Sequence, residues 1–276
     1  MSAGTRVSDS AAVTGLAGLG RQVRFLLGAY LAVPFAVRRH RREVLRLVSE
    51  VSLGSGALAL IGGTVVVISF LTAAVGIEVG IQGYTSLGNI GVSALSGFIA
   101  AYVNTREAAP AIAGIALTAT VGAGFTAQLG AMRVSEEIDA LEVMAIRSIP
   151  YLVSTRIAAG FLSVIPLYAV AVVMSYVSTR LVVTVFFGQS AGTYEHYFST
   201  FLIPADLLYS FGKALLMALL VLSICCYEGY TVKGGPAEVG RAVGRAVRTS
   251  LIAIMMLDLL FGLAVWGGTS TVHVAG

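Results

Sequence analysis

The chain has little charge, few cysteines and few histidines. Charged residues make up 12% of its 276 residues, against roughly 25% in a soluble domain. Its two cysteines, Cys225 and Cys226, are neighbours in an apolar run and cannot easily pair with each other, so no disulfide framework is predicted. The three histidines, His40, His196 and His273, are far apart in sequence, and no metal site is predicted. These shortages argue against a soluble, disulfide-stapled or metal-centred protein.

Nucleotide-binding and catalytic patterns are also missing. The nearest approach to the phosphate-binding pattern G-x-x-x-x-G-K-S/T is "GPAEVGRA" at 235–242, which lacks the lysine and the hydroxyl residue. No nucleophile with a base beside it stands out, and no cofactor is predicted. We expect the chain not to be an enzyme, so that any ATP hydrolysis would belong to another polypeptide.

Long apolar runs dominate what remains. Hydrophobic residues make up 57% of the chain and the mean hydropathy is +0.88. Several runs exceed the ~18–20 residues that a membrane-crossing helix needs, and they lack the alternation of β-barrel strands. The sequence predicts an all-α membrane protein with about five spans, over 52–77, 108–131, 152–185, 205–229 and 249–268.

One apolar stretch does not fit as a full crossing. Residues 86–104 are few and are interrupted by Gly88, Gly91 and Gly97. If residues 86–104 crossed the membrane, the acidic segment that follows the span 108–131 would lie outside. That segment is flanked by arginines such as Arg147, which the positive-inside rule places in the cytoplasm. We therefore expect 86–104 to be re-entrant or to lie along the outer face. Re-entrant backbone requires protein cover or a cavity.

The first 50 residues are predicted to form a cytoplasmic segment, apart from a membrane domain over 51–276. An apolar helical stripe over 15–31 is too charged to span but fits the membrane surface, and Pro34 is expected to end it. The stripe comprises Leu16, Leu19, Val23, Leu26, Leu27, Tyr30 and Leu31. The arginine-rich block at 38–46 predicts a cytoplasmic N-terminus, and five spans then leave the C-terminus outside. No nucleic-acid partner is predicted for a segment tied to the membrane.

A short acidic segment, "GAMRVSEEIDALEVM" at 130–144, stands out from these apolar surroundings. Ser135 is a good helix N-cap, and Glu136 and Glu137 would then occupy the first turn, where the helix dipole favours negative charge. Val134, Ile138, Leu141 and Ala145 would form one narrow apolar ridge. Because an anionic helix is repelled by an anionic leaflet, we predict that it docks into a basic-rimmed groove of a protein partner instead of lying on the membrane.

Two charges lie inside the predicted spans at matching depth. Lys213 and Asp258 are about eight and ten residues from the outer ends of their spans, so their depths agree within one turn at ~1.5 Å per residue. A charge in the membrane is expected to find a partner, and we predict a buried ion pair. The alternative is a proton relay with Glu107, which would make the chain a proton-coupled secondary transporter.

Small residues recur every fourth position in the second predicted span, at Gly114, Thr118, Gly122, Thr126 and Gly130. Such a ladder allows another helix to approach closely. That helix belongs either to the same chain or to a partner subunit, and the pattern favours neither.

The segment "GFTAQLGAMRVSEEIDALEVM" resembles the signature of the MlaE/YrbE permeases, the integral subunits of ABC lipid transporters that work with MCE proteins. "IQGY" at 81–84, "REAAP" at 106–110, "EGY" at 228–230 and Asp258 also have counterparts in that family. The details look most like the B-type YrbE subunit of actinobacterial MCE operons.

The resemblance implies a permease that moves lipids (phospholipid, fatty or mycolic acid, or sterol) across the inner membrane. Its expected partners are a cytoplasmic ABC ATPase, a second permease chain of the A type and MCE proteins on the outer side. The acidic helix would be the coupling helix seated in the ATPase, through Arg133, Glu136, Glu137, Asp139, Leu141 and Glu142. A third alternative is a scaffold that only anchors the MCE assembly.

The resemblance also implies an outward-facing lipid pocket between two permease chains. Its expected lining is Phe70, Val75, Ile77, Ile81, Tyr84, Thr105, Arg106 and Glu107. The apolar members would hold acyl chains, and Arg106 and Glu107 would meet a headgroup at the rim. The alternative is that these two are only an interfacial anchor. Ala108 and Ala109 replace the Leu-Gly that is common in the family, so the shape of the pocket is expected to differ.

Overall fold

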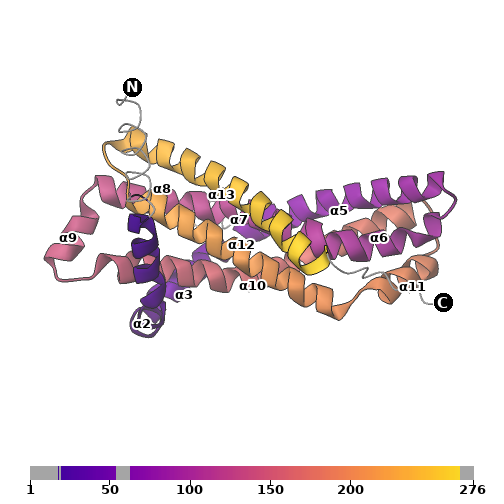
Figure 1. Cartoon of the computed structure of the whole chain (residues 1–276), viewed down its shortest axis with the longest axis horizontal. Helices are drawn as coiled ribbons and strands as arrows, with labels where there is room; N and C mark the ends of the chain where they lie inside the picture. The colour runs from indigo at the N-terminus through magenta and orange to yellow at the C-terminus, as the bar shows by residue number, and fades with distance from the viewer. Residues whose placement is uncertain (1–17, 19, 54–62, 268–276) are drawn as a thin grey trace, which may run out of the picture.

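The computed structural model describes residues 18, 20–53 and 63–267, and every regular element in them is a helix (Figure 1). Five helices of this part of the chain are long and apolar enough to cross a membrane: Gly63–Asn89, Ser93–Val134, Ile149–Phe186, Pro204–Tyr230 and Pro236–Trp266. The predicted fold class, an all-α membrane protein with five spans, is confirmed.

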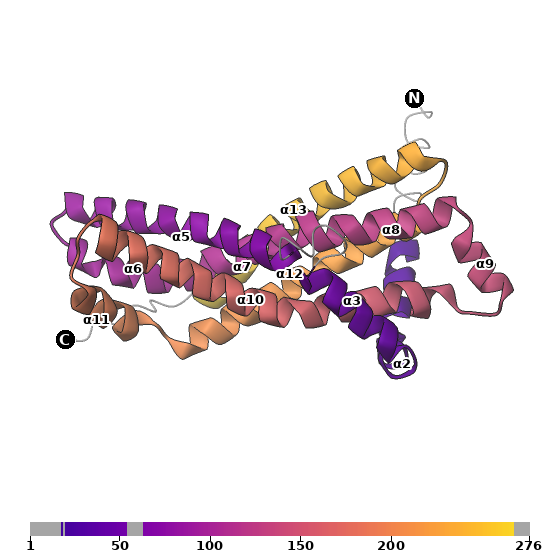
Figure 2. The ribbon, with the colours of Figure 1, turned by 180° about the vertical axis from the view of Figure 1, so that it is seen from behind.

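The spans form one elongated bundle. α9 (Glu137–Val143) lies at one end and α11 (Ala191–Phe201) lies at the other, as Figures 1 and 2 show. The span Ser93–Val134 has 42 residues. At ~1.5 Å per residue it is about 63 Å long, roughly twice the ~30 Å hydrocarbon thickness of a bilayer. The bundle therefore extends well beyond the apolar layer.

The chain after the first span differs from the expectation. α5 (Gly63–Asn89) continues twelve residues past the predicted end at residue 77, and after a turn the chain returns through η1 (Ser93–Leu95) and α6 (Ser96–Val103). The prediction of a re-entrant segment over 86–104 is therefore wrong. These residues form a helical hairpin whose return arm is the beginning of the second span, and α11 packs against α6 at this end (Figure 1).

The second span is continuous but not regular. It contains two turns of π-helix, and π-turns of this kind are frequent at functional sites. The order along the span is α6, η2 (Asn104–Ala108), α7 (Ala109–Leu117), η3 (Thr118–Gly122) and α8 (Ala123–Val134), with both η elements of the π type.

Close contact joins α5 to α10 (Thr155–Leu181). Thr179 Oγ1 donates a hydrogen bond of 2.7 Å to the carbonyl oxygen of Gly76. A Cβ atom at Gly76 would lie 2.6 Å from the carbonyl oxygen of Ser175, so only glycine permits this approach.

The ladder of small residues packs within the chain. A Cβ atom at Gly114 would contact Met217, and one at Gly122 would lie 2.8 Å from Cys225 Sγ, both on α12 (Pro204–Tyr230). At Gly130 a Cβ atom would meet Val239 of α13 (Pro236–Trp266). These three glycines therefore serve intramolecular helix packing. α13 also begins at Pro236, thirteen residues before the predicted start of the last span at 249.

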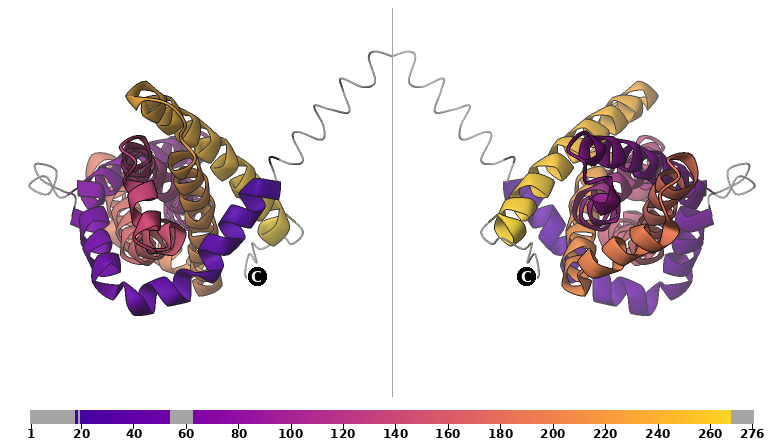
Figure 3. Two further views of the ribbon diagram at one scale, coloured as in Figure 1. Left: turned by 90° about the vertical axis from the view of Figure 1, so that its left-hand side faces the viewer. Right: turned by 90° about the vertical axis from the view of Figure 1, so that its right-hand side faces the viewer.

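Helical residues 20–31, α2 (Val33–Arg39) and α3 (Arg41–Leu53) curve around one side of the bundle, seen end-on in Figure 3. The helix over 20–31 ends before Pro34, which lies in the first turn of α2. In that helix, Tyr30 donates a hydrogen bond of 3.1 Å to the carbonyl oxygen of Leu219 on α12.

The described members of the apolar stripe over 15–31 differ in exposure. Tyr30 contacts α12, while Leu27 and Leu31 are exposed, and the predicted position of this helix on the membrane surface stays a prediction. Leu16 and Leu19, two members of the predicted stripe, lie outside the described residues.

Candidate functional site

α9 does not begin as the sequence suggested. Ser135 ends α8, and its hydroxyl donates to the carbonyl oxygen of Ala131 at 3.0 Å and to Glu137 Oε1 at 2.9 Å. Glu136 is the N-cap residue of α9, in the left-handed conformation at φ 60°. The prediction of Ser135 as the N-cap is therefore wrong, because α8 continues through the signature until the chain reverses at Glu136.

The faces of α9 also differ from the expected apolar ridge. Ile138 is fully buried and Leu141 packs against the same core, so both face their own chain. Val143 and Met144, which the sequence analysis did not single out, are 89% and 62% exposed. The apolar surface that α9 presents to its surroundings is therefore at its C-terminal end.

The carboxylates of α9 point outward. Glu136, Glu137, Asp139 and Glu142 are exposed. Arg133 Nη1 lies 2.8 Å from Asp139 Oδ1, with side chains 36% and 59% exposed. Glu142 accepts a hydrogen bond of 2.6 Å from Ser148. Arg133 and Ser148, the partners of Asp139 and Glu142, lie within six residues of them in sequence. The four carboxylates remain exposed, so most of their negative charge faces solvent.

The eight residues expected to line a lipid pocket divide into two groups. Phe70, Ile77 and Ile81 are exposed on α5, at 73%, 41% and 37%. Val75 is half-buried, and Tyr84 is half-buried with its ring stacked on Phe187 at 4.4 Å. The α5 members thus form an apolar face directed away from the chain's own core.

The second group faces the bundle interior. Thr105 and Arg106 are buried, at 1% and 2% exposure, and Thr105 Oγ1 lies 2.5 Å from the hydroxyl of Tyr176. Only the side chain of Glu107 is half-exposed, at 48%. One chain therefore does not bring these eight residues together around a single cavity.

Arg106 has a partner that the sequence analysis missed. Arg106 Nε and Nη2 donate to Asp206 Oδ2 at 2.9 and 2.6 Å, and Trp266 Nε1 donates to Asp206 Oδ1 at 3.0 Å. The guanidinium also lies over the ring of Tyr102, 3.9 Å from its centroid. Both guanidinium nitrogens thus share one carboxylate oxygen, Trp266 occupies the other, and the planar guanidinium also contacts an aromatic face.

Lys213 is the centre of a second ionic contact. Its side chain is fully buried, and Nζ lies 2.7 Å from Asp258 Oδ1 and 3.0 Å from Glu107 Oε2. The structure thus brings together the two residues paired from their depths, and Glu107, which the sequence analysis grouped with them only in the proton-relay alternative, contacts the same amine.

Pro110 explains why this cluster forms on the second span. Proline has no N–H, so a backbone carbonyl one turn earlier loses its helical hydrogen bond. Two carbonyls in that turn accept from α12 side chains instead. Ser210 donates to the carbonyl oxygen of Thr105 at 2.5 Å, and Lys213 donates to that of Arg106 at 3.0 Å.

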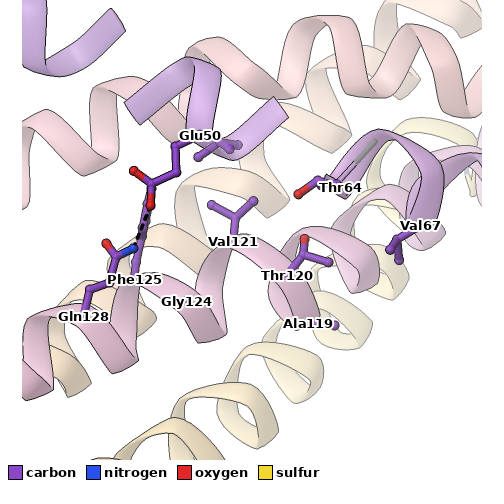
Figure 4. A pocket seen from close by; sticks show the side chains of 11 residues that line it. Glu50, Thr64, Val67, Ala119, Thr120, Val121, Gly124, Phe125 and Gln128 are labelled. Carbon is purple, nitrogen blue, oxygen red and sulfur yellow. Dashed lines mark hydrogen bonds between the residues drawn. The ribbon is translucent and has the colours of Figure 1, made fainter. Parts of the chain in front are cut away.

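A cavity of about 350 Å³ lies between α3, α5 and α8 (Figure 4). Val67, Val121 and Phe125 contribute to its apolar wall. Glu50 and Gln128 lie at its polar end, where Gln128 Nε2 donates to Glu50 Oε1 at 3.0 Å. Separately, no group of three or more possible metal ligands occurs in the part of the chain that the structure describes.

Comparison with known proteins places these features in a family. The family described as Permease MlaE matches residues 54–264. A "Probable ABC transporter permease protein" of Rickettsia bellii is 29% identical over 194 residues, which cover 70% of this chain and 75% of the relative. One of the same description from Synechocystis is 26% identical over 245 residues, with 89% and 90% covered. The Arabidopsis thaliana "Protein TRIGALACTOSYLDIACYLGLYCEROL 1, chloroplastic" is 28% identical over 186 residues, with 67% and 53% covered. Because the family match spans well over half of its length, this chain belongs to the MlaE permease family.

Proposed function

We propose that the chain is the membrane-spanning permease subunit of an ABC transporter that moves lipids or other hydrophobic molecules across the inner membrane. Its membership of the MlaE family and the names of its relatives support this role. ATP is hydrolysed by a separate cytoplasmic ATPase, since the sequence carries no phosphate-binding loop. The chain transmits the motion of that ATPase to the lipid path.

The observation that carries this proposal is the surface of α9. Val143 and Met144 are exposed beside outward-facing carboxylates, while Ile138 fixes the helix to the bundle. Exposed apolar side chains rimmed by charge are typical of a protein-docking surface. α9 is the coupling helix of this proposal, and Val143 and Met144 join the coupling residues in place of the inward-facing Leu141.

Charge distribution supports the orientation. Arg133, Arg147, Lys233 and Arg241 lie close in sequence to α9 or at the start of α13, at the α9 end of the bundle (Figure 1). The positive-inside rule places this end in the cytoplasm. The N-terminus then lies inside and the C-terminus outside, with α11 on the outer side.

A second permease chain of the A type completes the lipid pocket. Phe70, Ile77 and Ile81 present an apolar face on α5, and a facing chain would enclose it. Pockets for apolar ligands are concave and largely apolar, with few polar groups. MCE proteins on the outer side would receive or deliver the lipid at the end of the bundle formed by α5, α6 and α11.

The test is charge reversal on α9. Glu137→Lys with Asp139→Lys is expected to abolish co-purification of the ATPase and vanadate-sensitive lipid transport, because like charges at an interface cost several kcal/mol. The matched control is Glu195→Lys on α11, whose side chain is 57% exposed against 59% for Asp139. Normal transport by the double variant would contradict the coupling role.

A second candidate function rests on the cluster of Lys213, Glu107 and Asp258, which holds two carboxylates around one buried amine. Such a cluster inside a membrane is a common feature of proton relays. A proton-coupled carrier would transport lipid in response to an imposed proton gradient without nucleotide. Transport that needs ATP and ignores the gradient excludes this candidate.

A further inference from the structure

The cavity between α3, α5 and α8 has an unusual polar end. Arg156 is buried, with only 6% of its surface exposed, and its Nη2 donates a hydrogen bond of 3.2 Å to Gln128 Oε1. Gln128 in turn donates to Glu50, and Arg46 Nη1 donates to Glu50 Oε2 at 3.2 Å. The side-chain amide of Gln128 therefore lies between a buried guanidinium and a carboxylate, and both Gln128 and Glu50 line the cavity.

This network is not saturated. Arg156 Nε is buried and has no hydrogen-bond partner, and Arg156 forms no direct ion pair with any carboxylate among the described residues. Arg156 Nη1 donates to the carbonyl oxygen of Leu152 at 3.0 Å, which is a neutral acceptor. Arg156 stands behind Gln128, which lines the cavity, and it fixes the orientation of the Gln128 amide through Oε1.

The charges at this end cancel. Glu50 and Arg156 are one anion and one cation on either side of Gln128, and Glu43 and Arg46 form an additional pair on α3, with Arg46 Nη2 2.6 Å from Glu43 Oε1. An anionic head group at Gln128 would lie beside Glu50, and a cationic one beside Arg156. An uncharged group that both donates and accepts hydrogen bonds, such as a hydroxyl, meets no repulsion from either.

The remaining walls fit an apolar tail. Val67, Val121 and Phe125 line the cavity together with Gly124, and a Cβ atom at Gly124 would meet no atom within 4 Å. A volume of about 350 Å³ falls within the range of small-ligand sites. The cavity therefore has room for an apolar chain directly beside the backbone of α8.

The cavity also continues onto a surface that the proposed function already uses. Val67 lies one turn before Phe70 on α5, and both are exposed on the side that leads to Ile77 and Ile81. This last step rests on the proposed lipid transport. In that setting the cavity is the end of the lipid path nearer to α9, opposite to Tyr84.

We propose that the cavity between α3, α5 and α8 binds an amphiphile with an uncharged, hydroxyl-bearing head group, such as a diacylglycerol. The hydroxyl donates to Glu50 and accepts from the side-chain amide of Gln128, and one acyl chain lies along Val67, Val121 and Phe125. The chemistry selects against the same lipid with a phosphate on its head.

The experiment uses the full-length chain in detergent micelles, without ATPase or nucleotide, and two photo-reactive lipids. One is a diacylglycerol with a diazirine in its acyl chain, and the other is the phosphatidate with identical chains. Cross-linked peptides are quantified by mass spectrometry. We expect peptides that contain Val67 or Phe125 to be labelled about tenfold more by the diacylglycerol, which corresponds to about 1.4 kcal/mol.

Gly124→Leu is the variant that fills the cavity, and it is expected to reduce this labelling by about tenfold. The matched control is Gly212→Leu on α12, another helical glycine whose Cβ would meet no atom within 4 Å. Thermal unfolding of both variants shows whether the fold is kept; leucine also favours a helix over glycine. If Gly124→Leu fails to fold, a variant with Gly124→Cys and Val67→Cys replaces it. Cross-linking these two cysteines across the cavity is expected to reduce labelling by the diacylglycerol in the same way.

Equal labelling by the two lipids, or labelling that Gly124→Leu leaves unchanged, would overturn the proposal. Because labelling requires neither ATPase nor transport, its failure is distinct from that of the coupling test on α9. Labelling of a co-purified protein chain instead of the lipid site would also overturn it, since the cavity would then be a protein contact.

Discussion

Charged side chains gather in two regions of this protein, and their surroundings are opposite. Inside the bundle, Lys213 and Arg106 are buried and contact carboxylates of other helices. On α9, Asp139 is 59% exposed and pairs with Arg133, six residues away in sequence, while Glu137 is exposed as well. The buried charges therefore tie helices together, whereas the α9 charges add little to the fold and, in the proposed function, are available to the ATPase.

The energetic contrast follows from desolvation. A charge taken out of water must recover its hydration from ion pairs and hydrogen bonds, and removing one partner leaves the other uncompensated. An exposed pair is screened by solvent and contributes roughly 0–1 kcal/mol. Substitutions should therefore separate the two regions clearly by their effects on stability.

Lys213→Met should have the largest effect, because it leaves Asp258 and Glu107 without their shared cation. We expect the free energy of unfolding to fall by about 3–5 kcal/mol, seen as a lower midpoint of thermal unfolding in detergent and a lower yield of monodisperse protein. Asp258 is 21% exposed at its side chain, so water reaches it only partly.

The triple variant Lys213→Met, Glu107→Gln, Asp258→Asn should recover much of this loss, since no charge is then stranded. A triple variant as unstable as the single one would contradict the ion-pair account. A stable triple variant that has lost transport would support the proton-relay candidate instead.

Arg106→Leu should have the next largest effect. It strands Asp206, which then keeps only the indole N–H of Trp266 among its contacts described above. We expect a loss of about 3 kcal/mol. The matched control is Arg180→Leu, which removes the exposed pair with Glu195 at 3.4 Å and should cost less than about 1 kcal/mol. Similar unfolding midpoints for the two variants would remove the distinction between the regions.

The sequence predicted the buried ionic contacts correctly only where the helices that carry them are regular. Lys213 and Asp258 were paired because two regular helices keep residue depth proportional to residue number. Arg106 was expected at a pocket rim because of the family resemblance, and the sequence did not reveal that it lies in the π-turn of η2 with its side chain buried. The sequence analysis did not predict a role for Asp206, because an acidic residue in the first turn of a helix is ordinarily explained by its interaction with the helix dipole.

The expected re-entrant segment shows a second limit. Its length and its glycines were compared with the thickness of a bilayer, but α5 continues to Asn89 and the following hairpin lies beside α11 at the end of the bundle. The sequence around the end of a span does not indicate how far the helix continues beyond the membrane. The helix that packs against α6 is α11, which lies about 100 residues further along the chain. A contact between segments so far apart cannot be read from the local sequence.

On α9, Val143→Ser with Met144→Ser should leave the fold intact. Both side chains are exposed, so the free energy of unfolding is expected to change by less than about 0.5 kcal/mol. Binding of the ATPase should weaken strongly, because apolar contacts at the centre of an interface carry most of its affinity. The measurement is co-purification beside thermal unfolding, with Ile138→Ala as a contrast that should destabilise the chain because Ile138 is buried. Unchanged co-purification would show that the exposed apolar end of α9 is not a docking surface.

The smallest effect should come from the exposed pair on α3, and it should depend on pH. Arg46 donates hydrogen bonds to Glu43 and lowers the pKa of that carboxyl below its ordinary value. A carboxyl whose pKa is lowered by folding stabilises the folded state above its unfolded pKa, near 4.3, and that contribution disappears as the pH falls through the lower folded value. Glu43→Gln should therefore cost about 0.3–0.5 kcal/mol at pH 7, as expected for a solvent-screened pair on a helix, and less near pH 3, where the carboxyl is already protonated in the unfolded chain. Thermal unfolding of both proteins at the two pH values measures the difference. A cost at pH 7 as large as that of Lys213→Met would place this pair with the buried charges and break the contrast between the two regions.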